Sequence, residues 1–345
     1  MASPTMKYRH LGNTGLLVST LSLGCMTFDD KFGLDKTYAI MTKAYGAGVN
    51  YFDNAEAYGL GKSEEVVGQA IQKGIQNGVW SREDLVVSTK LFVGTTANPS
   101  PNSLGLNRKH IIEGIKASLR RLQLDYVDVL FCHRPDSSTP IEETVRAMNF
   151  VIEQGWAFYW GTSEWKSGDI IEACDVADRL GLVRPVVEQP QYNIFERSRV
   201  EFDFVNLYKK YGLGLTTFSP LRHGLISGKH TTGFVQGTRL TVPWIQNMVP
   251  DLELKIAKAE KMKVIAEDLG CSLPQLAIAW CASNPIVSTV MLGATSVDQL
   301  DENLKAYAFV DKITPEVKAR IDEIAQFVPQ HPAYDNHYTS REKFL

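Results

Sequence analysis

Eight short apolar segments alternate with longer amphipathic segments along this chain of 345 residues. The apolar segments are rich in Val, Leu, Tyr and Phe, which is typical of strands that are buried on both faces. Their predicted positions are residues 20–24, 49–53, 85–90, 126–133, 157–163, 185–189, 213–219 and 287–293. Because strands and helices alternate throughout, the pattern predicts βαβ units with parallel strands.

Helices are predicted between these strands, at residues 35–46, 63–74, 108–122, 139–154, 166–180, 198–211, 252–269 and 273–282. Thr139, Pro140 and Glu142 have the spacing of a capping box at the start of the fourth helix. The alternation fits either a closed (β/α)8 barrel or a doubly wound sheet. We favour an α/β fold of the TIM-barrel type, because no GxGxxG motif, the usual dinucleotide-binding fingerprint, follows the first strand.

Three segments lie outside the alternation. Residues 6–18 contain Asn13-Thr14-Gly15, a turn signal that predicts an N-terminal β-hairpin over the floor of the barrel. Residues 221–251 form a long connection after the seventh strand, and loops of that length are usually functional or disordered. The polar and aromatic tail 328–345 is expected on the surface. We predict one domain over residues 1–345, with a barrel core at about 7–327.

Composition excludes several classes of protein. The formal net charge is −3 and no basic block is present, so no nucleic-acid partner is expected. No apolar run approaches the ~20 residues of a membrane helix, and residues 1–21 lack the apolar region of a signal peptide. We therefore expect a cytoplasmic protein without membrane insertion. The five cysteines form no CxxC pair, which supports neither disulfides nor a zinc site, and we predict no metal.

Polar residues with reactive side chains follow several predicted strands. Active sites of (β/α)8 barrels form at the C-terminal ends of the strands. Strand two ends at Asp53, with Tyr58 shortly after it, strand three ends at Lys90 and strand four ends at His133. Any one of these residues could simply mark the surface. That interpretation explains less well why all four converge on one rim, and we predict that they are catalytic.

These four residue types suit the reduction of a carbonyl group. The carbonyl oxygen gains negative charge as a hydride arrives, and tyrosine can donate the proton that meets it. The reference pKa of ~10 makes tyrosine a slow acid near pH 7, so a neighbouring ammonium that lowers this pKa is expected. We predict Tyr58 as the donor, Lys90 as the ammonium, Asp53 as the partner of Lys90, and His133 as the residue that orients the carbonyl.

The hydride requires a cofactor, because no side chain supplies one. A nicotinamide dinucleotide suits the residues at the remaining strand ends. Ser163 and Gln189 can hydrogen-bond its carboxamide, and Phe218 can stack on the nicotinamide ring.

Two further segments carry candidate phosphate contacts. The turn from Gly293 through Thr295 to Gln299 opens a predicted helix and offers backbone N–H groups to a phosphate. Lys229 and Arg239 in the long loop could pair with phosphates, and the alternative is that both are solvated surface charges.

Several motifs resemble those of the aldo-keto reductase superfamily. The run Phe52-Asp53-Asn54-Ala55-Glu56-Ala57-Tyr58-Gly59 resembles its signature FDTAxxYG. Further matches, in the order of the family, lie at residues 87–90, 125–129 leading to 133, 160–163 and 292–296. The resemblance covers nearly the whole chain and implies a TIM barrel, an oxidoreductase activity on carbonyls and the cofactor NADPH.

Within that superfamily the chain looks most like the potassium-channel β-subunit branch, on segments 108–114, 139–148 and 273–281. The resemblance implies that Cys25 and Met26 lie near the nicotinamide ribose. It also implies that Ser219, Pro220 and Leu221 line the path of the pyrophosphate.

The same resemblance assigns the other end of the cofactor. Gln299, Glu302 and Asn303 would contact the adenosine. Lys229 and Arg239 align with residues that hold the 2′-phosphate, which implies NADPH over NADH. The long loop after strand seven would then cover the cofactor.

Two functions remain open. The first is NADPH-dependent reduction of aldehydes or ketones to alcohols, with Tyr58 as proton donor. The second is an NADPH-binding, redox-sensing regulatory subunit of a potassium channel with weak reductase activity. Channel subunits of animals often carry Asn at the position of His133, so this histidine favours the enzyme. Phe92, Trp165 and Trp244 are candidate walls of a pocket for a small-molecule carbonyl, and the resemblance allows a homotetramer.

Overall fold

Eight parallel strands form the centre of the molecule and close into a barrel in the order β10-β3-β4-β5-β6-β7-β8-β9. The computed structural model describes residues 6–229, 235, 239–242, 246, 249–335 and 337–345. The barrel strands are β3 (Leu21–Gly24), β4 (Tyr51–Asp53), β5 (Val86–Leu91), β6 (Val127–Cys132), β7 (Ala157–Ser163), β8 (Val187–Gln189), β9 (Gly214–Thr217) and β10 (Val287–Leu292). All eight predicted strands are confirmed, and barrel closure excludes the doubly wound sheet.

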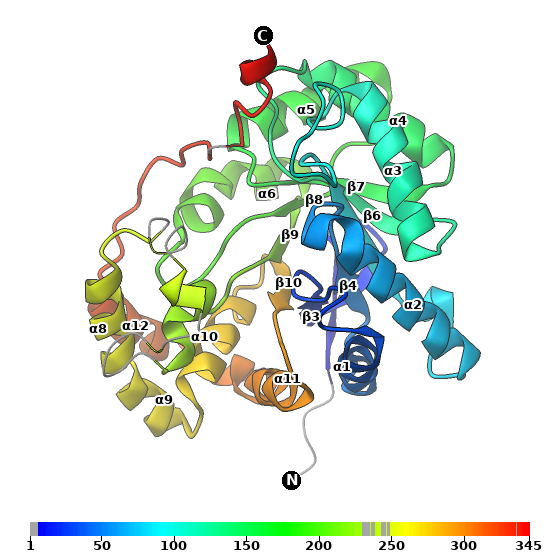
Figure 1. Cartoon of the computed structure of the whole chain (residues 1–345). Helices are drawn as coiled ribbons and strands as arrows, with labels where there is room; N and C mark the ends of the chain where they lie inside the picture. Colours follow the sequence, from blue (N-terminus) through cyan, green and yellow to red (C-terminus); the bar gives the residue numbers. More distant parts are fainter. Residues whose placement is uncertain (1–5, 230–234, 236–238, 243–245, 247–248, 336) are drawn as a thin grey trace.

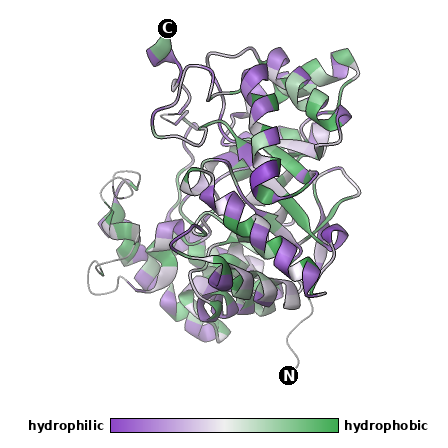
Figure 2. Cartoon of the chain, turned by 45° about the vertical axis from the view of Figure 1, so that its right-hand side comes forward, coloured by the Kyte–Doolittle hydropathy of each residue, from purple (hydrophilic) through white to green (hydrophobic). Residues whose placement is uncertain are grey.

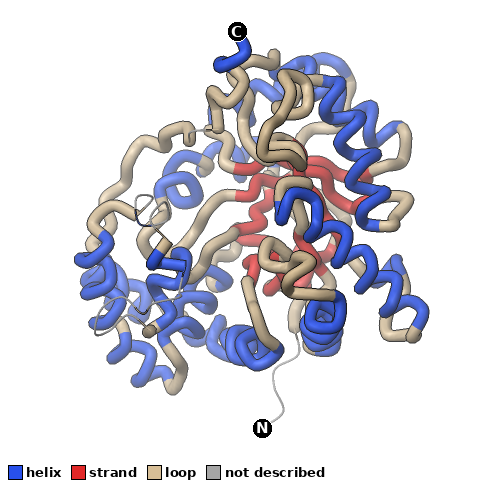
Figure 3. The backbone as a smooth tube through the Cα atoms, viewed as in Figure 1, coloured by secondary structure: helices blue, strands red, loops and turns tan. Residues whose placement is uncertain are grey.

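Helices surround the strands on the outside, as Figure 3 shows. In chain order they are α1 (Leu34–Gly46), α2 (Lys62–Gln76), α3 (Arg108–Leu122), α4 (Ile141–Glu153), α5 (Ser167–Leu180), α6 (Val205–Tyr211), α8 (Leu252–Lys261), α9 (Lys263–Leu269), α10 (Leu273–Ala282), α11 (Val297–Leu304) and α12 (Pro315–Ala325). Consecutive helices α1 to α6 contact one another, and α11 contacts α1, so that the outer layer follows the barrel (Figure 1).

Three local predictions about helices need correction. The expected helix at 198–211 consists of a π-helical turn at Arg199–Asp203 followed by α6. The expected helix at 252–269 is divided at Met262 into α8 and α9. The predicted capping box is absent, because the hydroxyl of Thr139 donates to Asp136 at 2.7 Å instead of capping α4.

The N-terminal hairpin closes one end of the barrel, as predicted. Strand β1 (Tyr8–His10) pairs antiparallel with β2 (Leu17–Ser19). Leu11, which follows β1, and Val18 of β2 belong to a buried cluster of side chains inside the barrel, which we call the interior cluster. The cluster consists of Leu11, Val18, Tyr51, Val86, Val129, Phe131, Val187 and Met291.

Gly12 lets this hairpin approach the strands closely. Its φ is +58°, and a Cβ at this position would lie 2.4 Å from the carbonyl oxygen of Val186 and 2.6 Å from the amide nitrogen of Gly214. A side chain would therefore collide with backbone, so the floor of the barrel can be closed only with glycine at this turn.

A larger core fills the space between the strands and the helices. Figure 2 shows hydrophobic residues along the central strands and a mixture of hydrophobic and hydrophilic residues along the helices. Trp160 and Trp165 are among the largest fully buried side chains of this core. Phe92 is buried in the same core, so neither Phe92 nor Trp165 is an open pocket wall. The third aromatic candidate, Trp244, lies outside the described residues.

The C-terminal tail runs from α12 back across the molecule to the side of α5, as Figure 1 shows. Arg134, which follows β6, donates to Asp335 of the tail at 2.6 Å. Arg341 reaches Asp136 at 3.2 Å. The tail therefore packs on the loops that follow β6, beside the C-terminal ends of the strands.

Candidate active site

Lys90 lies at the centre of a buried polar cluster at the strand ends. It is completely inaccessible to solvent on β5. Its ammonium contacts the carboxylate of Asp53 at 2.5 Å, the carbonyl oxygen of Asn54 at 2.7 Å and the phenol oxygen of Tyr58 at 3.1 Å. The register of the two strands pairs Asp53 of β4 with Ser88 of β5. Lys90 lies two residues after Ser88 on the same strand, so its side chain points to the same side and reaches Asp53.

The surroundings set the charges of this cluster. Burial alone would lower the pKa of Lys90, but the contacts with Asp53 and Tyr58 outweigh it and raise this pKa, so the ammonium stays charged. Burial raises the pKa of the Tyr58 phenol, and Lys90 offsets only part of that increase. The expectation that Lys90 brings the pKa of Tyr58 below its ordinary value is therefore wrong for the protein alone.

His133 faces Tyr58 from the end of β6. The two rings are nearly perpendicular, at 82°, with centroids 5.9 Å apart. Its backbone N–H donates to the carbonyl of Leu91 at 3.0 Å, which fixes the residue to the end of β5. Burial and the nearby charges of Arg134 and Lys90 hold the pKa of His133 well below its usual range, so the ring is neutral at pH 7. Nδ1 is buried and has no hydrogen-bond partner among the described residues.

The second carboxylate oxygen of Asp53 is also held. Ser88 donates to it at 2.7 Å, and the side-chain amide of Gln189 lies 3.2 Å away. Ser163 donates in turn to the carbonyl oxygen of Gln189 at 2.9 Å. The polar network thus continues from the predicted catalytic residues to the two residues predicted to bind a carboxamide.

Sequence reasoning missed Ser88, Asn54 and Arg134. Ser88 lies two residues before Lys90 on the same strand. Because side chains alternate along a strand, Ser88 and Lys90 face the same side, and the sequence could have revealed this contact. Arg134 follows His133 directly, and its guanidinium contacts the His133 carbonyl at 2.5 Å and the Ser163 hydroxyl at 3.5 Å. No pattern in the sequence distinguishes the Asn54 contact, since it involves a backbone oxygen.

The residues expected near the nicotinamide flank this network. Cys25 is buried and its backbone N–H donates to the carbonyl of Asp53 at 2.8 Å, whereas Met26 is half exposed. Phe218 is half-buried and packs against the interior cluster. Ser219 has a left-handed backbone with φ 56°, and the buried Pro220 follows it.

The predicted phosphate contacts in the long loop are only partly described. Leu221 is half-buried and precedes a 3-10 helix at Arg222–Ser227. Lys229 is exposed. The backbone of Arg239 belongs to a second 3-10 helix, at Arg239–Thr241, and its side chain lies outside the described residues. Much of the loop, at 230–234, 236–238, 243–245 and 247–248, also lies outside them, so its predicted cover over a cofactor stays a prediction.

The residues expected at the adenosine end gather around the start of α11. Gly293 is exposed, and a Cβ there would meet nothing within 4 Å. Gln299 accepts from the backbone and the hydroxyl of Thr295, at 2.8 and 3.0 Å. Asn303 donates to the carbonyl of Gly293 at 3.2 Å, and Glu302 accepts from Gln275 of α10 at 2.8 Å. One N–H of the predicted phosphate turn is therefore already capped by Gln299.

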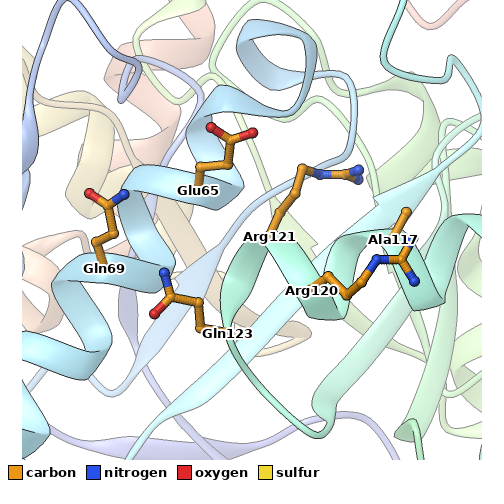
Figure 4. A pocket seen from close by; sticks show the side chains of 6 residues that line it. All are labelled: Glu65, Gln69, Ala117, Arg120, Arg121 and Gln123. Carbon is orange, nitrogen blue, oxygen red and sulfur yellow. The ribbon is translucent and has the colours of Figure 1, made fainter.

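A separate surface pocket lies between α2 and α3, shown in Figure 4, and is lined by Glu65, Gln69, Ala117, Arg120, Arg121 and Gln123. Both helices belong to the layer that surrounds the strands, so the pocket lies on the outer surface of the barrel. Within the described parts of the chain, no three His, Cys, Asp or Glu side chains gather as a metal site. No helix among them is long and apolar enough to cross a membrane.

A sequence model of the Aldo/keto reductase family matches residues 20–326. The chain belongs to this family. The family supports an oxidoreductase activity on carbonyls, and its members generally bind NADP(H).

Curated relatives are similar over almost their whole length. A "Probable voltage-gated potassium channel subunit beta" of Arabidopsis thaliana is 51% identical over 334 residues, covering 95% of this chain and 99% of the relative. A protein of the same description from Oryza sativa subsp. japonica is 50% identical, with 94% and 98% covered. A "Putative voltage-gated potassium channel subunit beta" of Schizosaccharomyces pombe is 43% identical, with 95% of each chain covered.

Proposed function

We propose that this aldo/keto reductase reduces aldehydes or ketones to alcohols with NADPH, with Tyr58 as the proton donor. The observation that carries the proposal is the position of the Lys90 ammonium, 3.1 Å from the Tyr58 phenol oxygen and paired with Asp53. This arrangement gives the phenol a fixed cationic neighbour in a buried site, where its charge acts more strongly than in water.

Each residue has a separate task in the proposed reaction. When bound, the reduced nicotinamide would supply the hydride to the carbonyl carbon. Tyr58 transfers its proton to the carbonyl oxygen, and the Lys90 ammonium stabilises the phenolate that remains. The neutral ring of His133 donates a hydrogen bond to the carbonyl oxygen and so orients it. Asp53 holds Lys90 in place.

The residues at the strand ends suit a dinucleotide. Phe218 is half-buried and directly follows β9, and a Cβ on the exposed Gly293 would meet nothing within 4 Å. Nδ1 of His133 is buried without a hydrogen-bond partner among the described residues. We assign the cofactor contacts to Cys25, Met26, Asp53, Ser163, Gln189, Phe218, Ser219, Pro220, Leu221, Lys229, Arg239, Gly293, Thr295, Gln299, Glu302 and Asn303. Binding at α11 would require Gln299 to release the Thr295 amide.

The test is a panel of aldehydes and ketones, monitored by the loss of NADPH absorbance. Turnover of at least one carbonyl class is expected, and a protein that reduces none contradicts the proposal.

The preference for NADPH is tested separately, by titrating the wild type and the Lys229→Ala, Arg239→Ala double variant with NADPH and with NADH. Charge-assisted hydrogen bonds contribute ~1.5–3 kcal/mol each, so NADPH should weaken far more than NADH. Equal weakening would remove both residues from 2′-phosphate recognition.

A second candidate function rests on the names of the relatives. Three similar proteins are described as potassium channel β subunits. In that case the chain would bind NADPH, associate with a channel as a regulatory subunit, and reduce carbonyls weakly. Tight NADPH binding without turnover across the panel would favour this function, and His133 argues for the enzyme. A homotetramer is proposed for either case and is checked by light scattering.

A further inference from the structure

Glu56 is a buried carboxylate inside the site that the proposed chemistry leaves without a task. It lies between Asp53 and Tyr58 in the chain, and 2% of its surface is exposed. One of its oxygens accepts three hydrogen bonds, from the backbone N–H groups of Phe92 and Gly94 at 2.8 and 2.9 Å and from His110 Nε2 at 3.0 Å. These three hydrogen bonds replace those that the carboxylate would make with water, and so offset the cost of burying it.

Helix α3 packs against the Glu56 carboxylate through Gly114 and His110. Its other oxygen faces α3, where a Cβ on Gly114 would come within 3.5 Å of it. His110, also on α3, is itself buried, and its backbone N–H is held by the side chain of Asn107 at 2.9 Å. The helix therefore presents the imidazole to Glu56 from a fixed position.

These contacts meet the segments that carry the reacting groups. The backbone N–H of Glu56 donates to the carbonyl of Lys90 at 3.1 Å. The carbonyl of Leu91, next along β5, accepts from the backbone of His133 at 3.0 Å. Glu56 thus links the turn before Tyr58 to the end of β5, and through it to His133.

We propose that Glu56 and His110 form a positioning pair, which holds the end of β5 so that Lys90, Tyr58 and His133 keep their mutual distances. This role rests on the proposed reductase function. Glu56 touches none of the reacting atoms and acts through the backbone of Phe92 and Gly94. Because hydride and proton transfer depend steeply on geometry, small shifts at the strand end slow the chemical step more than they weaken binding.

The experiment compares Glu56→Ala, which removes the acceptor, with Glu56→Gln, which keeps an oxygen for the two amides. Asp128→Ala is the matched control, since Asp128 is also a buried carboxylate that accepts from a backbone N–H of β5, that of Val87 at 2.8 Å, but at the start of the strand and away from Lys90. Glu56→Ala should lower kcat about tenfold while KM and the Kd for NADPH change little. Glu56→Gln should recover most of kcat, and Asp128→Ala should keep the wild-type kcat per folded molecule.

A second measurement does not depend on activity. Hydrogen exchange of the Phe92 and Gly94 amides should be slow in the wild type and in Glu56→Gln, and faster in Glu56→Ala. If Glu56→Ala is too unstable to purify, His110→Leu, which removes one donor and fills the space, should show a smaller fall in kcat at unchanged KM. Unchanged kcat and exchange in Glu56→Ala would overturn the positioning role. A wild type that reduces no carbonyl would overturn the proposed function before any variant is compared.

Discussion

Lys90 carries a charged ammonium that is completely buried, and burying this charge is costly in free energy. The cost is offset here by the Asp53 carboxylate, one backbone carbonyl and one phenol oxygen. Replacing any partner would leave part of that charge without compensation. The arrangement therefore ties the stability of the strand ends to the groups that are proposed to react.

Tyr58→Phe keeps the ring and removes the proton donor. We expect kcat to fall on the order of 10² or more, the usual loss for a general acid, with NADPH affinity largely kept. Tyr126→Phe is a suitable control, because Tyr126 precedes β6 at the opposite end of the barrel and its ring contacts that of Phe158, with the centroids 4.4 Å apart. Steady-state rates and NADPH titrations on both variants check this, and near-normal turnover in Tyr58→Phe would exclude the acid role.

His133→Asn keeps a donor but moves it. The amide of asparagine is shorter than an imidazole, so the carbonyl would sit at a different angle to the nicotinamide. We expect kcat/KM to fall at least about tenfold, or roughly 1.4 kcal/mol of transition-state stabilisation. Thermal melting and single-turnover NADPH oxidation should be measured on one preparation. A lower Tm with normal turnover per folded molecule would instead mean that His133 only supports the strand end.

The position of the candidate site residues could be predicted, and their electrostatics could not. Asp53, Lys90 and His133 end apolar segments, and in a parallel barrel those ends meet on one rim. The pKa directions of Tyr58 and His133 depend on how deeply each ring is buried. Burial results from packing between distant segments, so the sequence pattern does not contain it.

At the scale of elements, the strands were predictable because each is a separate apolar segment. The helices were predictable in position but not in continuity. Residues 198–211 contain no glycine or proline, so nothing in the sequence signals the π-helical turn at Arg199–Asp203. The same holds for the division between α8 and α9 at Met262, which is fully buried. Tertiary packing overrides the local helix preference at both places.

The N-terminal hairpin is attached to the barrel by Arg9. Its guanidinium donates to the carbonyls of Val287 and Ala282, at 2.6 and 2.8 Å, and so satisfies acceptors at the end of α10 and the start of β10. The last carbonyls of a helix have no partner within the helix, which makes them suitable targets for an arginine.

Arg9→Met keeps most of the apolar stem and removes these donors. Hydrogen bonds to charged groups contribute ~1.5–3 kcal/mol, so the free energy of unfolding should fall by a similar amount while turnover per folded molecule stays unchanged. Lys7→Met is the control, because Lys7 forms an exposed ion pair with Asp311 at 3.6 Å, and such pairs contribute little. Urea unfolding of both variants checks this. Equal stability of the two would mean that Arg9 does not anchor the hairpin.

At the scale of the whole molecule, the course of the C-terminal tail was the least predictable feature. Its contacts join residues about 200 positions apart, such as Arg134 with Asp335. Hydrophobic periodicity reports neighbours along the chain and carries no information on such pairs. The closure of the barrel was easier to predict from the sequence, because eight βαβ units can bury both faces of every strand in only a few arrangements.

The stability of the whole barrel should depend on Glu188 of β8. This carboxyl is fully buried, accepts from the hydroxyl of Thr162, and lies 3.3 Å from the backbone nitrogen of Trp165. Burial raises its pKa to about 8, against ~4.3 in an unfolded chain. The folded protein therefore keeps a proton that the unfolded chain releases. This contribution to stability is complete below the unfolded pKa and is lost as the pH rises through 8.

Glu188→Gln tests this dependence, because the amide is close in shape to the protonated acid and cannot ionise. Between pH 6.5 and 8 the wild type should lose up to ~1.4 kcal/mol of unfolding free energy per pH unit relative to the variant. That range avoids His133, whose lowered pKa acts in the opposite direction and only below its unfolded value near ~6.5. Urea titrations of both proteins at several pH values provide the measurement. Parallel stability curves for the two proteins would mean that Glu188 ionises normally in the folded barrel.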